Sequence, residues 1–174
     1  MKILFCRIGW MKFYKGNSES DTIKNGGSHP NENKHEVYNF QNVNGHCYGY
    51  VQPSKGTIRV SRIDKFSKDK VDGVLVIWIA KESSSCTNIV GWYRDATVYS
   101  EFQNSKLKER QKYCYNIEAK AENCVLLPEN DREKVIRPKE KKGFIGQSNV
   151  WFADSDNQEV KDYKKKVLKY ISEY

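Results

Sequence analysis

Three tryptophans of this chain stand where their rings could stack on a nucleic-acid base. Trp10, Trp92 and Trp151 each lie close to Gly, Asn or Ser, in stretches that we place at strand ends. Unpaired bases are held by stacking on such rings, at about 1–3 kcal/mol per base, while small polar groups read the base edge. The alternative is that the rings only fill the core, which is what we expect of Trp78 inside the apolar run VLVIWIA.

The charge of the chain favours a polyanionic partner. Its 174 residues include 30 Lys and Arg against 22 Asp and Glu, which gives a formal net charge of +8. Phosphate attraction supplies most of the non-specific affinity of proteins for nucleic acid. The alternative is a basic protein whose lysines are only solvated. The basic residues that we expect to contact phosphates are Lys55, Arg59, Arg62 and Arg94.

Few catalytic patterns are present. The three histidines lie in the first third of the chain and match no zinc-protease or zinc-deaminase spacing. The five cysteines include no CxxC pair, which argues against a structural zinc site and a disulfide scaffold. Glu118 and Lys120 form an ExK triplet on a candidate strand, a pattern that metal-dependent nucleases use. We expect no catalysis, metal or cofactor in this chain, and a small metal-dependent nuclease is an alternative function.

We expect short strands around one central hairpin to carry these residues. Two β-branched apolar runs, at residues 74–80 and 89–99, are separated by serines and form the expected central hairpin. Asn44-Gly45 is a hairpin-turn signal. The further expected strands are residues 2–8, 35–40, 47–52, 58–63, 113–121 and 123–127. We expect six or seven of these short strands to form a small barrel, which together with the terminal helix indicates an α+β domain.

The last element is an amphipathic helix. Apolar side chains recur at helical spacing through residues 154–174, and lysines fill the other faces. Ser155 and Gln158 match a capping box at its start. We expect a domain at residues 1–154 and a helix at residues 155–174 that packs on it or leads to an effector domain. No apolar run approaches the roughly 18–20 residues of a membrane helix, so we expect a cytoplasmic protein without a membrane partner.

Three motifs carry a resemblance to a known family. The apolar run at residues 74–80 followed by IVGWYRDATVY resembles the PUA-like superfamily, in particular its EVE and YTH branch. GGSH early, GWYRDATVY in the middle and GQSNVWFAD late are similar to N-terminal modules of bacterial modification-dependent (type IV) restriction systems. The resemblance covers roughly residues 1–154. It implies a PUA-like β-barrel of about six strands with flanking helices.

What this resemblance implies is a reader of modified bases that serves phage defence. Such domains hold a modified, commonly methylated, base in an aromatic cage after base flipping from DNA or from single-stranded RNA, and they target a fused or partner nuclease or motor. Carried over here, Trp92, Trp10 and Trp151 are the candidate walls. The other implied pocket residues are Tyr93, Ser28, Ser148 and Asn149. We therefore expect a DNA-binding module for a modified base, and an RNA-binding PUA-like protein is the alternative.

Overall fold

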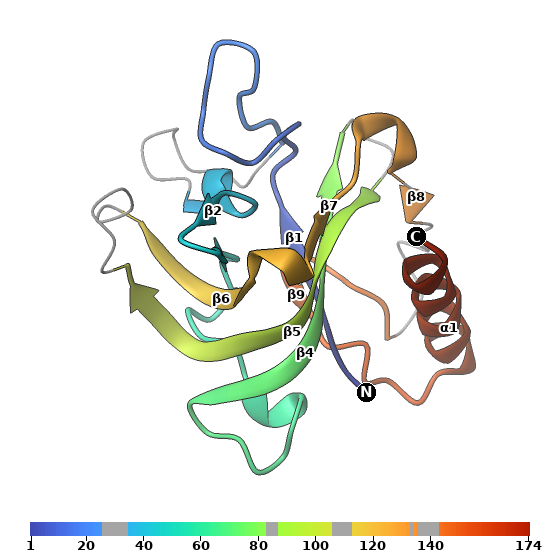
Figure 1. Ribbon diagram of the computed structural model, residues 1–174. Coiled ribbons are helices and arrows are strands. Elements are labelled where there is room, and N and C mark those ends of the chain that lie inside the picture. Colours follow the sequence, from blue (N-terminus) through green and yellow to red (C-terminus); the bar gives the residue numbers. More distant parts are fainter. Residues whose placement is uncertain (26–34, 83–86, 106–112, 133, 136–142) are drawn as a thin grey trace.

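The computed structural model describes residues 1–25, 35–82, 87–105, 113–132, 134–135 and 143–174, which form one mixed sheet and one α-helix (Figure 1). The strands are β1 (Lys2–Ile8), β2 (Asn42–Val43), β3 (His46–Gly49), β4 (Lys70–Lys81), β5 (Thr87–Asn104), β6 (Cys114–Lys120), β7 (Cys124–Leu126), β8 (Lys134–Val135) and β9 (Val150–Trp151). The helix is α1 (Gln158–Glu173), and short 3-10 turns are η2 (His35–Tyr38), η3 (Val60–Arg62), η5 (Ala121–Asn123) and η6 (Glu129–Asp131).

The sheet is open. Its strand order is β2-β3-β6-β5-β4-β1-β9, with β7 and β8 also paired to β5. Strand β1 runs parallel to β4, and the other pairs are antiparallel. In the part of the chain that the structure describes, β2 and β9 end the order and do not pair with each other. The expected α+β class and terminal helix are confirmed, but the expected closure into a barrel is wrong.

The central hairpin is confirmed as β4 and β5, and both faces of it are buried. Every residue of 74–80 is at most 9% exposed. Side chains alternate across a strand, so Trp78 packs in one core while Ile77 packs in the other. On β5, Tyr93 and Trp92 divide between the same two cores. A hairpin buried on both faces needs a cover on each side.

Different segments supply the two covers. One face is covered by residues around the first strand and η2, including Trp10, Tyr14 and Phe40. The other face is covered by α1, whose buried side chains are Val160, Val167 and Ile171. In Figure 1 the helix lies beside the sheet near the chain's beginning. The terminal helix therefore packs on this face of the sheet.

The helix begins two residues later than a Ser155 cap requires. Its N-cap is Asn157, whose Oδ1 accepts a hydrogen bond from the Glu159 N–H at 2.8 Å. The Ser155 hydroxyl instead accepts from the Asn157 N–H at 3.3 Å, so the capping box with Gln158 was wrong. Asn is among the preferred N-cap residues because its short side chain reaches a free backbone donor.

Two expected strands contain 3-10 turns instead, and the segment between them is held by buried asparagine side chains. Residues 35–40 contain η2, and Asn39 bonds both the N–H and the C=O of Tyr50, at 2.9 and 3.0 Å. Residues 58–63 contain η3, and they follow Val51, whose N–H and C=O are bonded by Asn116 at 3.1 and 2.8 Å. Each side-chain amide replaces the pair of bonds that a neighbouring strand would make.

The expected turn at Asn44-Gly45 is confirmed. Both residues have positive φ, 51° and 84°, as the turn of a two-residue hairpin requires, and they join β2 to β3. The strand expected at residues 47–52 is shorter in the structure, where β3 ends at Gly49. Among the described helices, none has the length and apolarity needed to cross a lipid bilayer.

Gly91→Ala should destabilise the protein by about 1–3 kcal/mol, as overpacking a core does. A Cβ at this position would lie 2.3 Å from the Val125 backbone oxygen, which is fixed by the β5–β7 pairing. Denaturant unfolding measures the change. Gly146→Ala is the control, because a Cβ there meets nothing within 4 Å, and it should change stability by less than about 0.5 kcal/mol. Equal stability of the two variants would contradict this packing.

Candidate functional site

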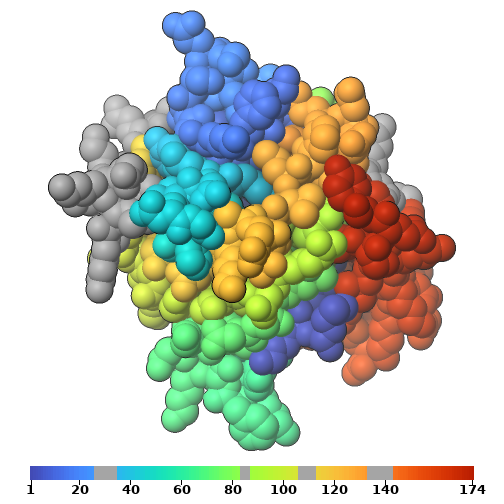
Figure 2. All heavy atoms as spheres, in the orientation of Figure 1, coloured from blue at the N-terminus to red at the C-terminus, as the bar shows by residue number. Residues whose placement is uncertain are grey.

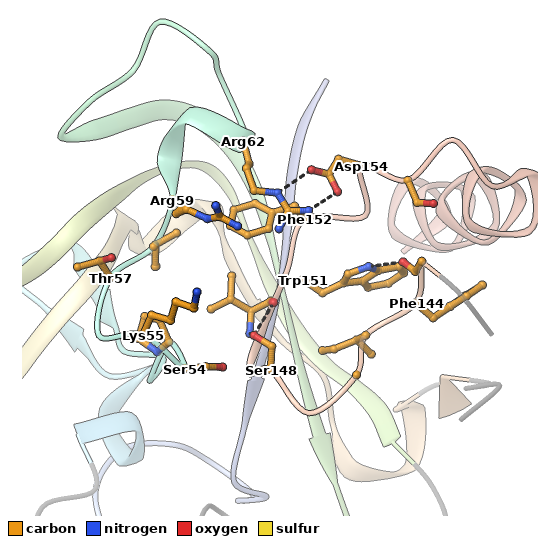
Figure 3. A pocket seen from close by; sticks show the side chains of 17 residues that line it. Ser54, Lys55, Thr57, Arg59, Arg62, Phe144, Ser148, Trp151, Phe152 and Asp154 are labelled. Atoms are coloured by element: carbon orange, nitrogen blue, oxygen red, sulfur yellow. Dashed lines mark hydrogen bonds and ion pairs between the residues drawn. The ribbon is translucent and has the colours of Figure 1, made fainter. Parts of the chain in front are cut away.

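A pocket of about 540 Å³ lies where residues 53–62 approach residues 143–155 (Figure 3). Its volume is within the usual range for small-ligand sites. The structure brings five of the residues singled out in the sequence to this pocket. They are Lys55, Arg59, Arg62, Ser148 and Trp151. Other residues that line it are Ser54, Thr57, Phe144, Phe152 and Asp154.

Backbone bonds and buried anchors position the first wall. A turn closes with the Gly56 N–H donating to the Pro53 carbonyl at 3.1 Å, and this turn exposes Lys55. The Ile58 N–H donates to the Ser100 carbonyl of β5 at 2.9 Å. Ile58 is buried in the first core, so its neighbour Arg59 is turned to solvent. The cations of this wall are therefore carried on a segment fixed to the sheet.

The second wall is the edge strand β9 and the segment before it. The Ser148 hydroxyl donates to the Val150 carbonyl at 2.9 Å and accepts from the Val150 N–H at 3.2 Å. It thereby satisfies backbone groups that a further strand would otherwise pair with. Asn149 donates from its side chain to the Gln52 carbonyl at 3.1 Å, and its own carbonyl accepts from the Arg7 N–H at 2.7 Å. Ser148 thus fixes the conformation of the second wall, and Asn149 ties this wall to the segment that leads into the first.

The pocket carries an excess of positive charge. The Arg62 guanidinium donates to both carboxylate oxygens of Asp154, at 2.8 and 2.6 Å, and lies 4.2 Å from the centre of the Phe152 ring. This pairing lowers the pKa of Asp154. Lys55 and Arg59 are exposed and form no ion pair with the residues that the structure describes. Two exposed cations at the rim therefore remain available to an anion.

The ring of Trp151 is packed rather than open. It lies 4.7 Å from the Phe5 ring and 5.6 Å from the Phe144 ring, between centroids, and its Nε1–H donates to the Gly143 carbonyl at 2.9 Å. Only 8% of the residue is exposed. Figure 3 shows Trp151 and Phe144 together on the side of the pocket opposite Lys55 and Arg59. Trp151 contributes to the wall, while its faces are occupied by other aromatic rings.

The structure does not bring the three candidate tryptophans into one cage. Trp10 is 4% exposed in the first core, with the Arg132 guanidinium 4.4 Å from its ring centre. Trp92 is fully buried in the second core, 5.4 Å from the Tyr174 ring between centroids. Tyr93 is fully buried on the first face, with its hydroxyl donating to the Asn39 carbonyl. The rings of Trp10 and Trp92 lie on opposite faces of the sheet, and Trp78 is core as expected.

The predicted phosphate contact Arg94 lies away from this pocket. Arg94 donates to the Ile171 carbonyl near the end of α1 at 3.0 Å, and its guanidinium is 5.7 Å from the Trp92 ring centre. It therefore caps the helix and does not line the pocket. Ser28 lies outside the described residues.

The ExK triplet has local partners. The Tyr99 hydroxyl donates to the Glu118 carboxylate at 2.7 Å, and burial raises the pKa of Tyr99. Lys120 pairs with Glu122 at 3.8 Å. Among the described residues, no three His, Cys, Asp or Glu side chains gather in a way that could hold a metal ion.

Some pocket residues were not identified in the sequence. Phe152 and Asp154 come just after β9, and both contact Arg62, which lies 92 residues before Asp154 in the chain. No local pattern links these positions, because the contact arises only when the two segments meet. For the wall formed by residues 53–62, the sequence did contain a local signal, which is the turn at Pro53-Ser54-Lys55-Gly56.

Comparison with known proteins gives no relative: no protein-family model matches the chain, and neither a curated protein sequence nor a solved structure matches it.

Asp154→Asn should destabilise the protein at pH 6 by at most about 1 kcal/mol, as is usual for a partly exposed pair. Because Arg62 lowers the pKa of Asp154 below 3.8, the carboxylate stabilises the fold above this pH, and the contribution is lost as the pH falls through the folded-state value. Denaturant unfolding at pH 6 and pH 3 measures the difference between variant and wild type.

The matched control for this pair is Asp69→Asn, at an exposed carboxylate outside any ion pair formed among the described residues. It should change stability little at either pH. A destabilisation by Asp154→Asn that is as large at pH 3 as at pH 6 would show that the ion pair is not its cause.

Proposed function

We propose that this chain is a PUA-like DNA-binding module that reads a modified base and brings a nuclease or motor to it. The observation that carries the proposal is the pocket of about 540 Å³ with Lys55 and Arg59 exposed at its rim. A base that has left a duplex arrives with a phosphate on each side, so its receptor needs a cavity for the ring and cations beside it.

The charges of the pocket suit a nucleotide. Lys55 and Arg59 lie on the same segment and can approach phosphates without giving up an ion pair within the described residues. The Arg62 guanidinium is held in place by Asp154 and by the Phe152 ring. A fixed guanidinium loses little conformational freedom when a ligand binds. The formal charge of these four ionisable residues is +2, which favours an anion over a neutral ligand.

The walls of the pocket combine apolar surface with hydroxyl groups. Ile58, Ile145 and Val150 contribute apolar side chains, and Ser54 and Thr57 contribute hydroxyls. Recognition of an extruded base needs these two elements, since the ring is enclosed by apolar contact and its edge is read by hydrogen bonds. Because other aromatic rings pack against Trp151, we do not propose that the base stacks on that ring.

The direct test is binding of the chain to matched duplexes that differ only in one cytosine or adenine, unmodified or methylated, at two salt concentrations. A preference for one modified duplex that persists at the higher salt supports the proposal. Equal binding to all duplexes that weakens steeply with salt would leave only phosphate attraction and overturn the reading of a modified base. Competition by single-stranded RNA that exceeds every duplex would favour the RNA-binding alternative.

Replacing both rim cations, Lys55→Gln with Arg59→Gln, should weaken binding to every duplex alike. The slope of log affinity against log salt should fall in magnitude by about 1.8, since each phosphate contact contributes about 0.9. Fluorescence anisotropy across a salt series measures it. The charge-matched control is Lys165→Gln with Lys169→Gln on α1, where both lysines pair along the helix. An unchanged slope in the rim variant, or an equal loss in the control, would contradict this role for the pocket.

A further inference from the structure

One aromatic side chain projects into solvent on the segment that carries the rim cations. Phe66 is 82% exposed, in the loop between η3 and β4. A phenylalanine exposed to this degree forgoes the free energy that burial of its ring would supply. Figure 2 shows this loop, in green, projecting from the body of the molecule. The ring follows Arg62 of the pocket by only four residues in the chain.

The loop is held in one conformation by its own hydrogen bonds. Asp64 accepts the Phe66 N–H at 3.1 Å through its carboxylate and the Ser67 N–H at 2.9 Å through its carbonyl. The same carboxylate pairs with Lys2 at 3.0 Å, which ties the loop to the start of β1. Further along, the Asp69 carbonyl accepts the Ser100 N–H at 2.7 Å. Phe66 is therefore presented from a turn that hydrogen bonds hold in place, with 82% of the residue exposed.

The surroundings of Phe66 are basic. Residues 55–70 contain six Lys and Arg against two Asp, and all six cations are exposed. The Lys65 ammonium lies 4.8 Å from the centre of the Phe66 ring. Lys68 follows on the same loop, and Lys70 is the first residue of β4. A projecting apolar ring among cations suits a partner that has a phosphate surface and an apolar interior, and stacked base pairs provide both.

We propose that Phe66 is a wedge that inserts between base pairs of duplex DNA, beside the base that enters the pocket. This inference rests on the proposed function and names duplex DNA, rather than a single strand, as the partner of that same site. Extrusion of a base breaks stacking on both of its neighbours, and an inserted ring replaces part of that stacking. The cations at 65, 68 and 70 would contact the phosphates on either side of the opened step.

The test compares the wild-type chain with Phe66→Ala on the duplex that binds best, with 2-aminopurine placed next to the recognised base. Wild type should raise the 2-aminopurine fluorescence on binding, because the probe is unstacked. Phe66→Ala should lose most of this rise and bind about tenfold more weakly. Phe66→Trp should restore both. Because the ring is exposed, neither variant should change the unfolding midpoint.

Phe13→Ala is the matched control, since Phe13 is also exposed, at 46%, and lies next to a lysine in a different loop. It should bind and unstack the probe as wild type does. Wild-type affinity together with a full fluorescence rise in Phe66→Ala would overturn the wedge while leaving the proposed function standing. Failure of wild type to bind any duplex would overturn both. Binding to phosphatidylserine vesicles that is lost in Phe66→Ala, with unchanged DNA binding, would assign the ring to a membrane surface.

Discussion

Strands β4 and β5 bury apolar side chains on both of their faces, and the other elements are placed by the need to cover those faces. Residues 74–80 lose contact with water almost completely. Burial of a large apolar side chain stabilises a protein by roughly 1.5–3 kcal/mol, so a hairpin of this kind supplies much of the folding free energy. One face is completed by the segments that hold Trp10 and Tyr14, and the other by α1. The helix is therefore part of the folded unit, whatever follows it in the chain.

Because both faces of β4 and β5 are covered, a ligand can bind only elsewhere on the molecule. Both faces of the central strands are filled, so free polar groups gather at the edge of the sheet and on the segments beside it. The short strand β9 forms that edge, and Ser148 satisfies the outward backbone groups of Val150. The segment with Lys55 and Arg59 lies across from it, tied to β5 through Ile58. The two walls of the candidate pocket are thus attached to strands of the sheet, although much of each wall is loop.

The sequence predicted the strongly patterned parts of this fold. The central hairpin, β1 and β6, the turn at Asn44-Gly45 and the terminal helix all have local signals, and all are present. It could not predict that β3 ends at Gly49, because the buried amides of Asn39 and Asn116 bond the backbone of Tyr50 and Val51 in place of a neighbouring strand. It also could not predict that β9 forms an open edge of the sheet, since β9 pairs with β1, which is far away in the chain.

The candidate site was predicted in part, and the reasons differ by residue type. The exposed cations Lys55 and Arg59 were found because a turn and an alternating pattern mark their positions. The aromatic cage was expected because Trp and Tyr stand beside Gly and Asn, but that pattern does not distinguish a rim from a strand buried on both faces. Trp92 and Tyr93 occupy such a strand. The contact of Arg62 with Asp154 joins two distant segments and has no signal in the local sequence.

Amide hydrogen exchange of the chain, free and bound to the modified duplex that it prefers, would locate the DNA on the molecule. If the pocket receives the base, DNA should protect residues 53–62 and 143–155 and leave exchange in α1 unchanged. Protection confined to α1, or to η2 and β3, with exchange around Lys55 and Ser148 unaltered, would contradict it and place the nucleic-acid surface elsewhere on the molecule.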